Sequence, residues 1–349
     1  MEQTMAKVTV IIPHSGGEEI LRHCLRSLQK TQYLNYKILV VDNGSRDGSR
    51  RMIRLEFPEV RIVESQTNLG FAAGCNLGIR DTRSPYVVLL NNDTEVTSGW
   101  LDPLVEAADT DATIGAIQPK ILSYQDRQRF DYGGGAGGEI DLFGYPFAWG
   151  RLFDHIEVDT GQYDQQRQVF WASGAATLLR RSALDRVGLL DETFFAHMEE
   201  IDLNWRLQWA GYRVVAIPNA VVFHQTGATL GQHQFRKMVL NHRNSLVMML
   251  RNHTTCTLLW IFPLRLLLEM ITMIASLFRG QAKRTVAVLG GLIGVCFMWK
   301  TVIRGRRAIE SVRSVHEEVL LHRMYRGSVA LAYFLRGIRR TGSLLPVSR

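Results

Sequence analysis

The sequence predicts an α/β protein built on a parallel sheet with helices over both of its faces. Its first third alternates short β-branched and aliphatic runs, uncharged in their interiors, with segments whose apolar residues recur at helical spacing. Strands without a polar–apolar alternation are buried on both faces, which is typical of parallel sheets covered by crossover helices. The 349 residues are enough for one large domain or two medium ones.

The elements of this first third follow one another in a strand–helix order. The predicted strands are Val8–Pro13, Lys37–Val41, Val60–Glu64 and Tyr86–Leu90. The predicted helices between them are Glu18–Lys30, Gly48–Glu56 and Asn68–Arg80. Right-handed crossovers would bring the carboxyl ends of these strands to one edge of the sheet, where ligands bind in such folds.

The middle of the chain, roughly 120–170, has no clear period and contains the glycine-rich segment Tyr132–Gly138. We interpret it as loops and a hairpin that wall a site. Regular structure is expected again beyond this segment. The expected elements are a strand region at Phe170–Arg180, a helix at Glu200–Gly211, and strands at Tyr212–Ile217 and Ala220–His224.

The composition changes beyond about residue 232, which suggests a catalytic body over 1–231 and a C-terminal helical region over 232–349. Residues 279–349 hold 14 Lys and Arg against 3 Asp and Glu, whereas the first 278 hold 27 against 30. Trp260–Phe278 is apolar but contains two charges, and the 15 uncharged residues of Thr285–Trp299 would span about 22 Å as a helix. We therefore expect helices that lie in or dip into one leaflet, with packing on the body or in a dimer as the alternative.

Several classes of protein are excluded by composition. The mean hydropathy of −0.04 is too polar for a multi-span membrane protein. The four cysteines are far apart and form no Cys-x-x-Cys pair, which argues against a zinc ribbon or a disulfide framework and fits a reducing compartment. The N-terminus shows no charged segment leading into an apolar one, so no secretory signal is expected.

Two motifs follow predicted strands at the ligand edge. Asp42-Asn43 comes directly after a strand, where a carboxylate commonly accepts hydrogen bonds from a nucleotide's base or ribose. Asn91-Asn92-Asp93 follows the strand Tyr86–Leu90, and one carboxylate suffices for a divalent cation that also binds two phosphates. A helix cap and an Asx turn are the structural alternatives for these two motifs.

A second group of polar residues lies late in the body. Glu199 and Glu200 open a helix; they are either partners of the helix dipole or carboxylates placed in a cleft, one as general base. Asp202 cannot share a face with Glu200, since residues two apart diverge on a helix. His224 ends an apolar strand at the same edge as Asp93 and is either structural or a ligand better suited to Mn²⁺ than to Mg²⁺.

The order of these segments resembles family 2 glycosyltransferases of the GT-A fold, most closely their rhamnosyltransferase-type branch. The segments that carry the resemblance cover about residues 7–230: VTVIIP, VVDNGS, NLGFAAGCN, LLNNDTEV, WASGAATLLRR, FFAHMEEIDLNWR and VVFH. The chain departs from the family pattern at Pro13-His14, in the loss of the first acid of the DxD motif, and in Glu rather than Asp at 200. The fold implied is a mixed, mostly parallel sheet with helices on both faces and a membrane-associating C-terminal helical region.

The resemblance also implies roles for individual residues. Asp93 and His224 would hold Mn²⁺ or Mg²⁺ on the donor's diphosphate. Glu200 would be the catalytic base, with Glu199 beside it as the alternative base. The residues that would bind the nucleotide-sugar are Pro13, Asp42, Asn43, Asn68, Gly74, Asn76, Asn92, Trp171 and Gly174.

The activity implied is a metal-dependent, inverting transfer of a sugar, with rhamnose as one candidate. The donor would be a dTDP-, UDP- or GDP-linked sugar, and the acceptor a hydroxyl of a glycan or a polyprenyl-diphosphate glycolipid in cell-surface polysaccharide synthesis. The protein would be cytoplasmic and peripheral at the inner face of the plasma membrane, because the apolar content of the basic tail favours lipid over nucleic acid. The alternatives are an inactive nucleotide-sugar-binding or scaffold protein on the same fold and, ranked lower, a nucleotidyltransferase.

Overall fold

The central sheet has its strands in the order β11-β13-β6-β12-β4-β1-β2-β3, and β5 pairs with β13 beside this path. Four parallel strands form one half: β1 (Val8–His14), β2 (Tyr36–Asn43), β3 (Arg61–Ser65) and β4 (Tyr86–Leu90). The other half is mixed and contains β5 (Thr94–Val96), β6 (Ile114–Ser123), β11 (Arg167–Gln168), β12 (Ala176–Arg180) and β13 (Arg213–His224). The computed structural model describes residues 6–225 and 234–346.

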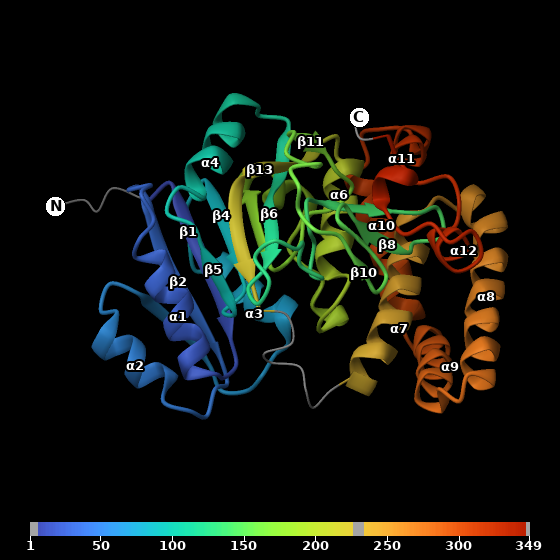
Figure 1. Cartoon of the computed structure of the whole chain (residues 1–349), viewed down its shortest axis with the longest axis horizontal. Coiled ribbons are helices and arrows are strands. Elements are labelled where there is room, and N and C mark those ends of the chain that lie inside the picture. Colours follow the sequence, from blue (N-terminus) through green and yellow to red (C-terminus); the bar gives the residue numbers. More distant parts are fainter. Residues whose placement is uncertain (1–5, 226–233, 347–349) are drawn as a thin grey trace.

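Helices cover both faces of the sheet, as the uncharged strand interiors predict (Figure 1). Along β1, Val8, Val10 and Ile12 belong to one apolar cluster and Ile11 to another, so neither face of this strand contacts water. The first cluster contains α1 (Glu18–Leu28), α2 (Ser49–Glu56) and α4 (Leu101–Thr110), and the second contains α3 (Phe71–Arg80), α5 (Arg181–Val187) and α6 (Glu199–Trp209).

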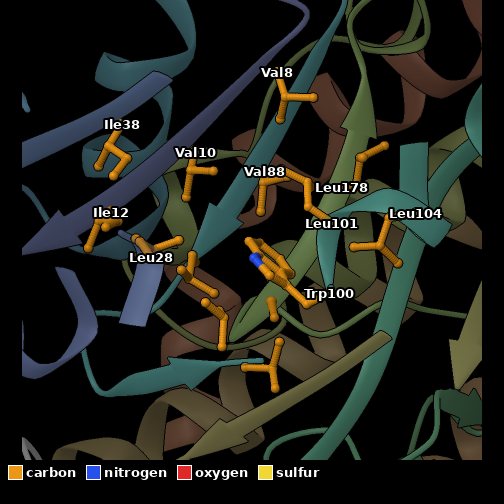
Figure 2. Packing of buried hydrophobic residues seen from close by; sticks show 14 of the residues in the cluster. Val8, Val10, Ile12, Leu28, Ile38, Val88, Trp100, Leu101, Leu104 and Leu178 are labelled. Atoms are coloured by element: carbon orange, nitrogen blue, oxygen red, sulfur yellow. The ribbon is translucent and has the colours of Figure 1, made fainter. Parts of the chain in front are cut away.

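Trp100 is the largest side chain in the first cluster and is fully buried. Figure 2 shows its ring among side chains of the sheet, including Val88, with Leu101 nearby. The indole Nε1 donates to the hydroxyl of Thr31 at 3.1 Å, which satisfies the only polar atom that the ring brings into the core. This packing fixes the helices behind the strands whose carboxyl ends form the site.

The sheet is mixed and mostly parallel, as the resemblance implies, since β12 runs antiparallel to both of its neighbours. Three details differ from the sequence expectations. The segment between β4 and β6 contains a helix, α4, where no element was expected. The two strands expected at 212–217 and 220–224 form one strand, β13, because an irregularity between Ile217 and Val221 lets its pairing with β6 continue. The middle region contains a second, four-stranded antiparallel sheet: β7 (Gly138–Ile140), β8 (Pro146–Ala148), β9 (Arg151–Leu152) and β10 (His155–Ile156).

The C-terminal helices pack against α6 and the small sheet (Figure 1). They are α7 (Gln234–Asn252), α8 (Thr255–Phe278), α9 (Ala282–Phe297), α10 (Trp299–Val312), α11 (Glu317–Arg323) and α12 (Val329–Phe334). Trp205 and Trp209 of α6 share an apolar cluster with Val247, Ile309 and Leu320. The expected boundary between 231 and 232 lies outside the described residues.

Helix α8 is long and apolar enough to cross a membrane by length and composition, and the bent pair of α9 and α10 passes the same test only if counted together. The two charged residues within α8, Arg265 and Glu269, are both fully buried and form an ion pair of 2.6 Å. Both side chains face the body, where Arg265 also donates to the carbonyl oxygen of Phe143. The outer face of α8 is apolar and exposed, notably at Leu259, Leu264, Leu267, Ile274, Leu277 and Phe278.

Candidate active site

A cavity of about 790 Å³ is lined by residues at the carboxyl edge of the sheet together with residues of α7, α8 and α12. The sequence-predicted residues among its lining are Asp93, His224, Glu199, Glu200, Trp171 and Gly174. The proposed cation ligands and the proposed base are therefore in one cavity rather than on separate surfaces.

The pairing of β13 with β5 brings Asp93 and His224 together. His224 is the register partner of Thr94, the residue after Asp93, and its Nε2 lies 3.1 Å from Oδ1 of Asp93. The other ring nitrogen, Nδ1, lies 2.8 Å from Oδ1 of Asp131. All three side chains are buried. Burial alone would lower the pKa of His224, but its interactions with the carboxylates of Asp131 and Asp93 outweigh burial and raise that pKa to about 10.

The donor chemistry at this point fits a divalent cation that also takes phosphate oxygens. Oδ1 of Asp93 is buried and, despite its closeness to the His224 ring, accepts no hydrogen bond of good geometry from the described residues. A carboxylate that holds Nδ1 of a histidine orients its Nε2 toward a metal, which is the position of Asp131. Among the described residues no group of three or more His, Cys, Asp and Glu forms a complete metal centre. Asp93 and His224, with the imidazole in its neutral form, could supply two of the ligands, and phosphate oxygens and water could supply the others.

Glu199 and Glu200 begin α6 directly after a strained loop. Phe195, His197 and Met198 all have positive φ angles, of 66°, 70° and 75°, a conformation that side chains other than glycine rarely adopt. The loop is held by Asn244 of α7, whose Nδ2 lies within 3.0 Å of the carbonyl oxygens of residues 194, 196 and 197. A single buried amide thus fixes the direction in which the first turn of α6 enters the cavity.

The two glutamates have perturbed acidities. Burial raises the pKa of Glu200, and burial together with the negative charge of Glu200 raises the pKa of Glu199 well above its ordinary value. One oxygen of each carboxyl is buried without a hydrogen bond to any described residue. A carboxyl with a raised pKa and no fixed partner is available to take a proton from a bound hydroxyl.

Asp202 has a separate role, as the helical spacing predicts. It is fully buried, and Oδ2 lies 2.9 Å from Nε of Arg206 on the same helix. Its Oδ1 accepts from Nδ2 of Asn252 at 2.9 Å, so this carboxylate ties α6 to α7. It belongs to the packing that supports the site and not to the lining of the cavity.

Several predicted nucleotide-binding residues lie at the ends of β1, β2 and β4, outside the lining of the cavity. Asp42 is the register partner of His14, accepts from the backbone N of Ser45 at 3.0 Å and lies 3.3 Å from Nε of Arg50. Nδ2 of Asn92 lies 2.9 Å from Nδ1 of His14. This places Asp42, His14, Asn92 and the preceding Pro13 around one corner of the strand ends.

The other predicted residues of this group hold the loop and helix of α3. Asn43 accepts from the backbone N of Leu69 and donates to the carbonyl of Gly70 and the side chain of Asn68. A Cβ added to Gly74 would lie 3.1 Å from that same amide of Asn43, so glycine allows the helix to approach the strand end. Asn76 is fully buried and exchanges hydrogen bonds with the backbone of Leu190. The structure gives Asn43 and Asn76 structural roles.

Trp171 and Gly174 line the cavity just before β12, whose first residue pairs with the carboxyl end of β4. The indole of Trp171 packs on Gly138 so closely that an added Cβ there would lie 2.0 Å from the ring. Its Nε1 donates to the carbonyl of Glu139 at 2.8 Å, which fixes the plane of the ring. An added Cβ on Gly174 would lie 3.8 Å from Cβ of Glu200, so the glycine borders the proposed base.

Sequence reasoning missed two residues of this site. Asp131 lies in the middle region that was interpreted only as loops, and an acid immediately before a glycine run was the one available signal. Asn244 lies on α7, 47 to 50 residues beyond the carbonyl groups that it holds, and no local pattern marks it.

Comparisons with known proteins agree with this fold. The structure is similar to that of GalNAc-T7 solved with UDP, GalNAc and Mn²⁺, with a TM-score of 0.55 and 16% identity over 71% of this chain and 48% of that one. It is also similar to a mannosyltransferase from Pyrobaculum calidifontis in complex with GDP-Man and Mn²⁺, with a TM-score of 0.51 and 16% identity over 89% of this chain and 86% of that one. These likenesses show a GT-A-like fold.

The family is shown by sequence. The model of glycosyl transferase family 2 matches residues 9–188, and the chain belongs to this family. An N-acetylglucosaminyl-diphospho-decaprenol L-rhamnosyltransferase of Mycobacterium tuberculosis is 27% identical over 306 residues, covering 81% of this chain and 97% of that protein. An O-antigen biosynthesis protein of Myxococcus xanthus is 26% identical over 64% of this chain, which corresponds to 18% of its own length.

Proposed function

We propose that this protein is an inverting glycosyltransferase that moves a sugar from a nucleotide-diphosphate donor to a hydroxyl of a polyprenyl-linked glycolipid in cell-surface polysaccharide synthesis. The observation that carries the proposal is that Asp93, His224 and the pair Glu199–Glu200 line one cavity. The full-length similarity to a rhamnosyltransferase that acts on a decaprenol-linked N-acetylglucosamine supports both the acceptor class and rhamnose as the sugar.

The proposed reaction is a single displacement. The acceptor hydroxyl oxygen forms a bond to the anomeric carbon while the bond from that carbon to the donor's phosphate oxygen breaks. Glu200 takes the hydroxyl proton, and the nucleoside diphosphate leaves with the bonding electrons. Because the attack is opposite to the leaving group, the configuration at the anomeric carbon inverts.

Glu200 is the better candidate for the base of the two glutamates. Two adjacent carboxyls in a buried site do not both ionise readily, since each charge disfavours the other. The pKa of Glu199 is raised both by burial and by the charge of Glu200. In the proposed reaction Glu199 keeps its proton and Glu200 is the carboxylate that accepts the proton of the substrate.

Asp93 and His224 are the residues that would hold Mn²⁺ or Mg²⁺ on the donor's diphosphate. Such a cation neutralises the charge that grows on the departing phosphate. The corner formed by Pro13, Asp42 and Asn92 would take the nucleoside, with Asn43, Asn68, Gly74 and Asn76 holding the adjoining loop and helix. Trp171 and Gly174 would border the sugar.

The exposed apolar face of α8 and the basic residues of the C-terminal region would hold the protein peripherally on the inner face of the plasma membrane. A lipid-linked acceptor lies at such a surface, and anionic headgroups attract clustered Lys and Arg.

The proposal is tested with the purified full chain, Mn²⁺ and a panel of dTDP-, UDP- and GDP-linked sugars, with N-acetylglucosaminyl-diphospho-polyprenol as acceptor. We expect one donor to give a product of inverted configuration and the Asp93→Asn variant to give none. Failure of every donor both to transfer its sugar and to be hydrolysed would contradict the proposal and would leave a binding or scaffold protein.

A further inference from the structure

The cavity extends beyond the residues that the proposed reaction uses. Part of its lining, here called the apolar limb, consists of apolar side chains of two C-terminal helices. They are Leu268, Ile271 and Ala275 of α8 and Leu331 and Phe334 of α12. Ile271 and Phe334 are 48% and 47% exposed. This limb therefore opens onto the exposed apolar face of α8, and the reacting centre is continuous with that face.

Cations without carboxylate partners line the same cavity. Lys237 of α7, Arg279 at the end of α8 and Arg284 of α9 form no ion pair with any residue that the structure describes. Arg265 differs, because Glu269 offsets its charge. Unpaired cations on the wall of a cavity attract an anion.

Two of these cations, Lys237 near the start of α7 and Arg279 just after the end of α8, lie at one end of this pair of helices. Helices α7 and α8 follow one another in the chain, so the start of α7 and the end of α8 lie at the same end of the pair (Figure 1). The Nζ of Lys237 lies 5.7 Å from the centre of the Tyr132 ring, and both residues line the cavity together with His197, Glu199 and Glu200. The cations and the glutamates therefore share one cavity wall.

We propose that this limb is the binding site for the lipid diphosphate of the acceptor. Lys237, Arg279 and Arg284 bind its phosphate oxygens, and the apolar chain lies between α8 and α12 and leaves along the outer face of α8. This inference rests on the proposed function, because it assigns residues to the acceptor of that reaction. The cavity would then hold two diphosphate groups: that of the donor at Asp93 and His224, and that of the acceptor at the three cations.

The chemical groups in such an acceptor match the kinds of side chain in the lining. The reacting hydroxyl belongs to a sugar, the sugar is joined to a diphosphate, and the diphosphate is joined to an apolar chain. The cavity is lined by carboxylates, by cations, and by apolar side chains that include the half-exposed Ile271 and Phe334. A bilayer headgroup would match only the last two and would place nothing at Glu200.

The test measures binding of geranylgeranyl diphosphate to the full chain in detergent by isothermal titration calorimetry, with Mn²⁺ and a saturating nucleoside diphosphate present. We expect the double variant Arg279→Ala/Arg284→Ala to bind at least about tenfold more weakly, because charge-assisted hydrogen bonds to phosphate are lost. Lys237→Met provides a second, independent variant with the same expected direction. The matched control is Arg304→Ala/Arg307→Ala, which removes two exposed cations of α10 that do not line the cavity.

The apolar limb is tested in the same assay. Ile271→Asn should weaken binding of geranylgeranyl diphosphate, whereas Leu289→Asn should not, because Leu289 is similarly exposed (48%) but lies outside the cavity lining. Geranylgeraniol, which lacks the diphosphate, and inorganic pyrophosphate, which lacks the chain, should each bind more weakly than the complete ligand.

Three results would overturn this inference. Displacement of geranylgeranyl diphosphate by the nucleoside diphosphate would place the lipid in the donor site. An equal loss of affinity in Arg279→Ala/Arg284→Ala and in Arg304→Ala/Arg307→Ala would show that any surface cation attracts the lipid. Unchanged binding in all cavity variants would exclude the limb as the binding site. The proposed function fails separately: wild-type protein that transfers no sugar but binds the lipid diphosphate as described would keep the site and refute the reaction.

Discussion

The Nδ1 atom of His224 lies 2.8 Å from Oδ1 of Asp131, and the opposite nitrogen of the ring faces Asp93. The strand β13 carries the histidine, whereas Asp131 comes from the loop before the small sheet. Two segments that are 93 residues apart thus fix the orientation of one imidazole. The imidazole ring is therefore held with its Nε2 atom directed toward Asp93.

Replacing Asp131 with Asn should weaken the cation site without removing a ligand. Carboxylates that orient a ligating histidine are typically worth about 10–100-fold in metal affinity. We expect the Kd for Mn²⁺, measured in the presence of a nucleoside diphosphate, to rise by about this factor. An unchanged Kd in a folded Asp131→Asn protein would show that the carboxylate does not act through His224.

The pH dependence of kcat/KM should report the raised pKa of the base. Only ionised Glu200 accepts a proton, and burial raises its pKa above the ordinary value of 4.5. Activity should therefore fall with decreasing pH through a point that lies above 4.5. A profile whose acidic limb falls at or below this value would contradict a buried carboxyl as base.

Asn244 should act on the rate rather than on binding of the donor. Asn244→Ala frees three carbonyl oxygens of the strained loop before Glu199, so the glutamates lose their fixed position. We expect kcat to fall about 10–100-fold, the donor's KM to stay nearly constant, and the free energy of unfolding to fall by about 1–3 kcal/mol. The matched control is Asn219→Ala at an exposed position of β13. Equal kcat in the two variants would show that Asn244 only stabilises the fold.

Attachment to membranes should depend on the outer apolar face of the C-terminal helices. Deleting residues 255–349 is a poor test, because it removes Ile309 and Leu320 from the cluster that buries Trp205. The variant Phe278→Ser/Phe297→Ser leaves that cluster intact and changes side chains that are 86% and 83% exposed.

We expect this variant to partition at least about tenfold less onto phosphatidylglycerol vesicles in a sedimentation assay, because each buried Phe contributes about 1.5–3 kcal/mol. Leu34→Ser/Leu55→Ser is the control, since both leucines are exposed on the catalytic body. Equal partitioning of the two variants would contradict attachment through the C-terminal face.

The parallel half of the sheet and the edge that carries the site were predictable from the sequence. Asp42, Asp93 and His224 each lie at or just after the end of a predicted strand. Because the carboxyl ends of parallel strands meet at one edge of a sheet, the three residues were expected at that edge. The antiparallel pairing of β13 with β5 sets His224 beside Asp93 at this edge, and binding of a cation by the two residues stays a prediction.

The remainder depended on contacts between distant segments. The antiparallel course of β12 follows from its neighbours β4 and β6 and not from its own residues. The side chain of Arg265 points into the protein because it pairs with Glu269 and donates to the carbonyl oxygen of Phe143 in another segment. Asn244 donates hydrogen bonds to backbone carbonyl oxygens, which every residue type carries, so no residue pattern could predict these contacts.

The most direct test of the account compares Glu200→Gln with the wild type, with Glu199→Gln as the matched control. Glutamine keeps the shape of the side chain but cannot take a proton, and general-base catalysis contributes about 10²–10⁴-fold. We predict that kcat of Glu200→Gln falls by that factor while the Kd for Mn²⁺ and nucleoside diphosphate is unchanged, and that Glu199→Gln stays within about tenfold of the wild-type kcat. Wild-type turnover by Glu200→Gln would remove Glu200 from the reaction, and a loss confined to Glu199→Gln would move the base by one residue.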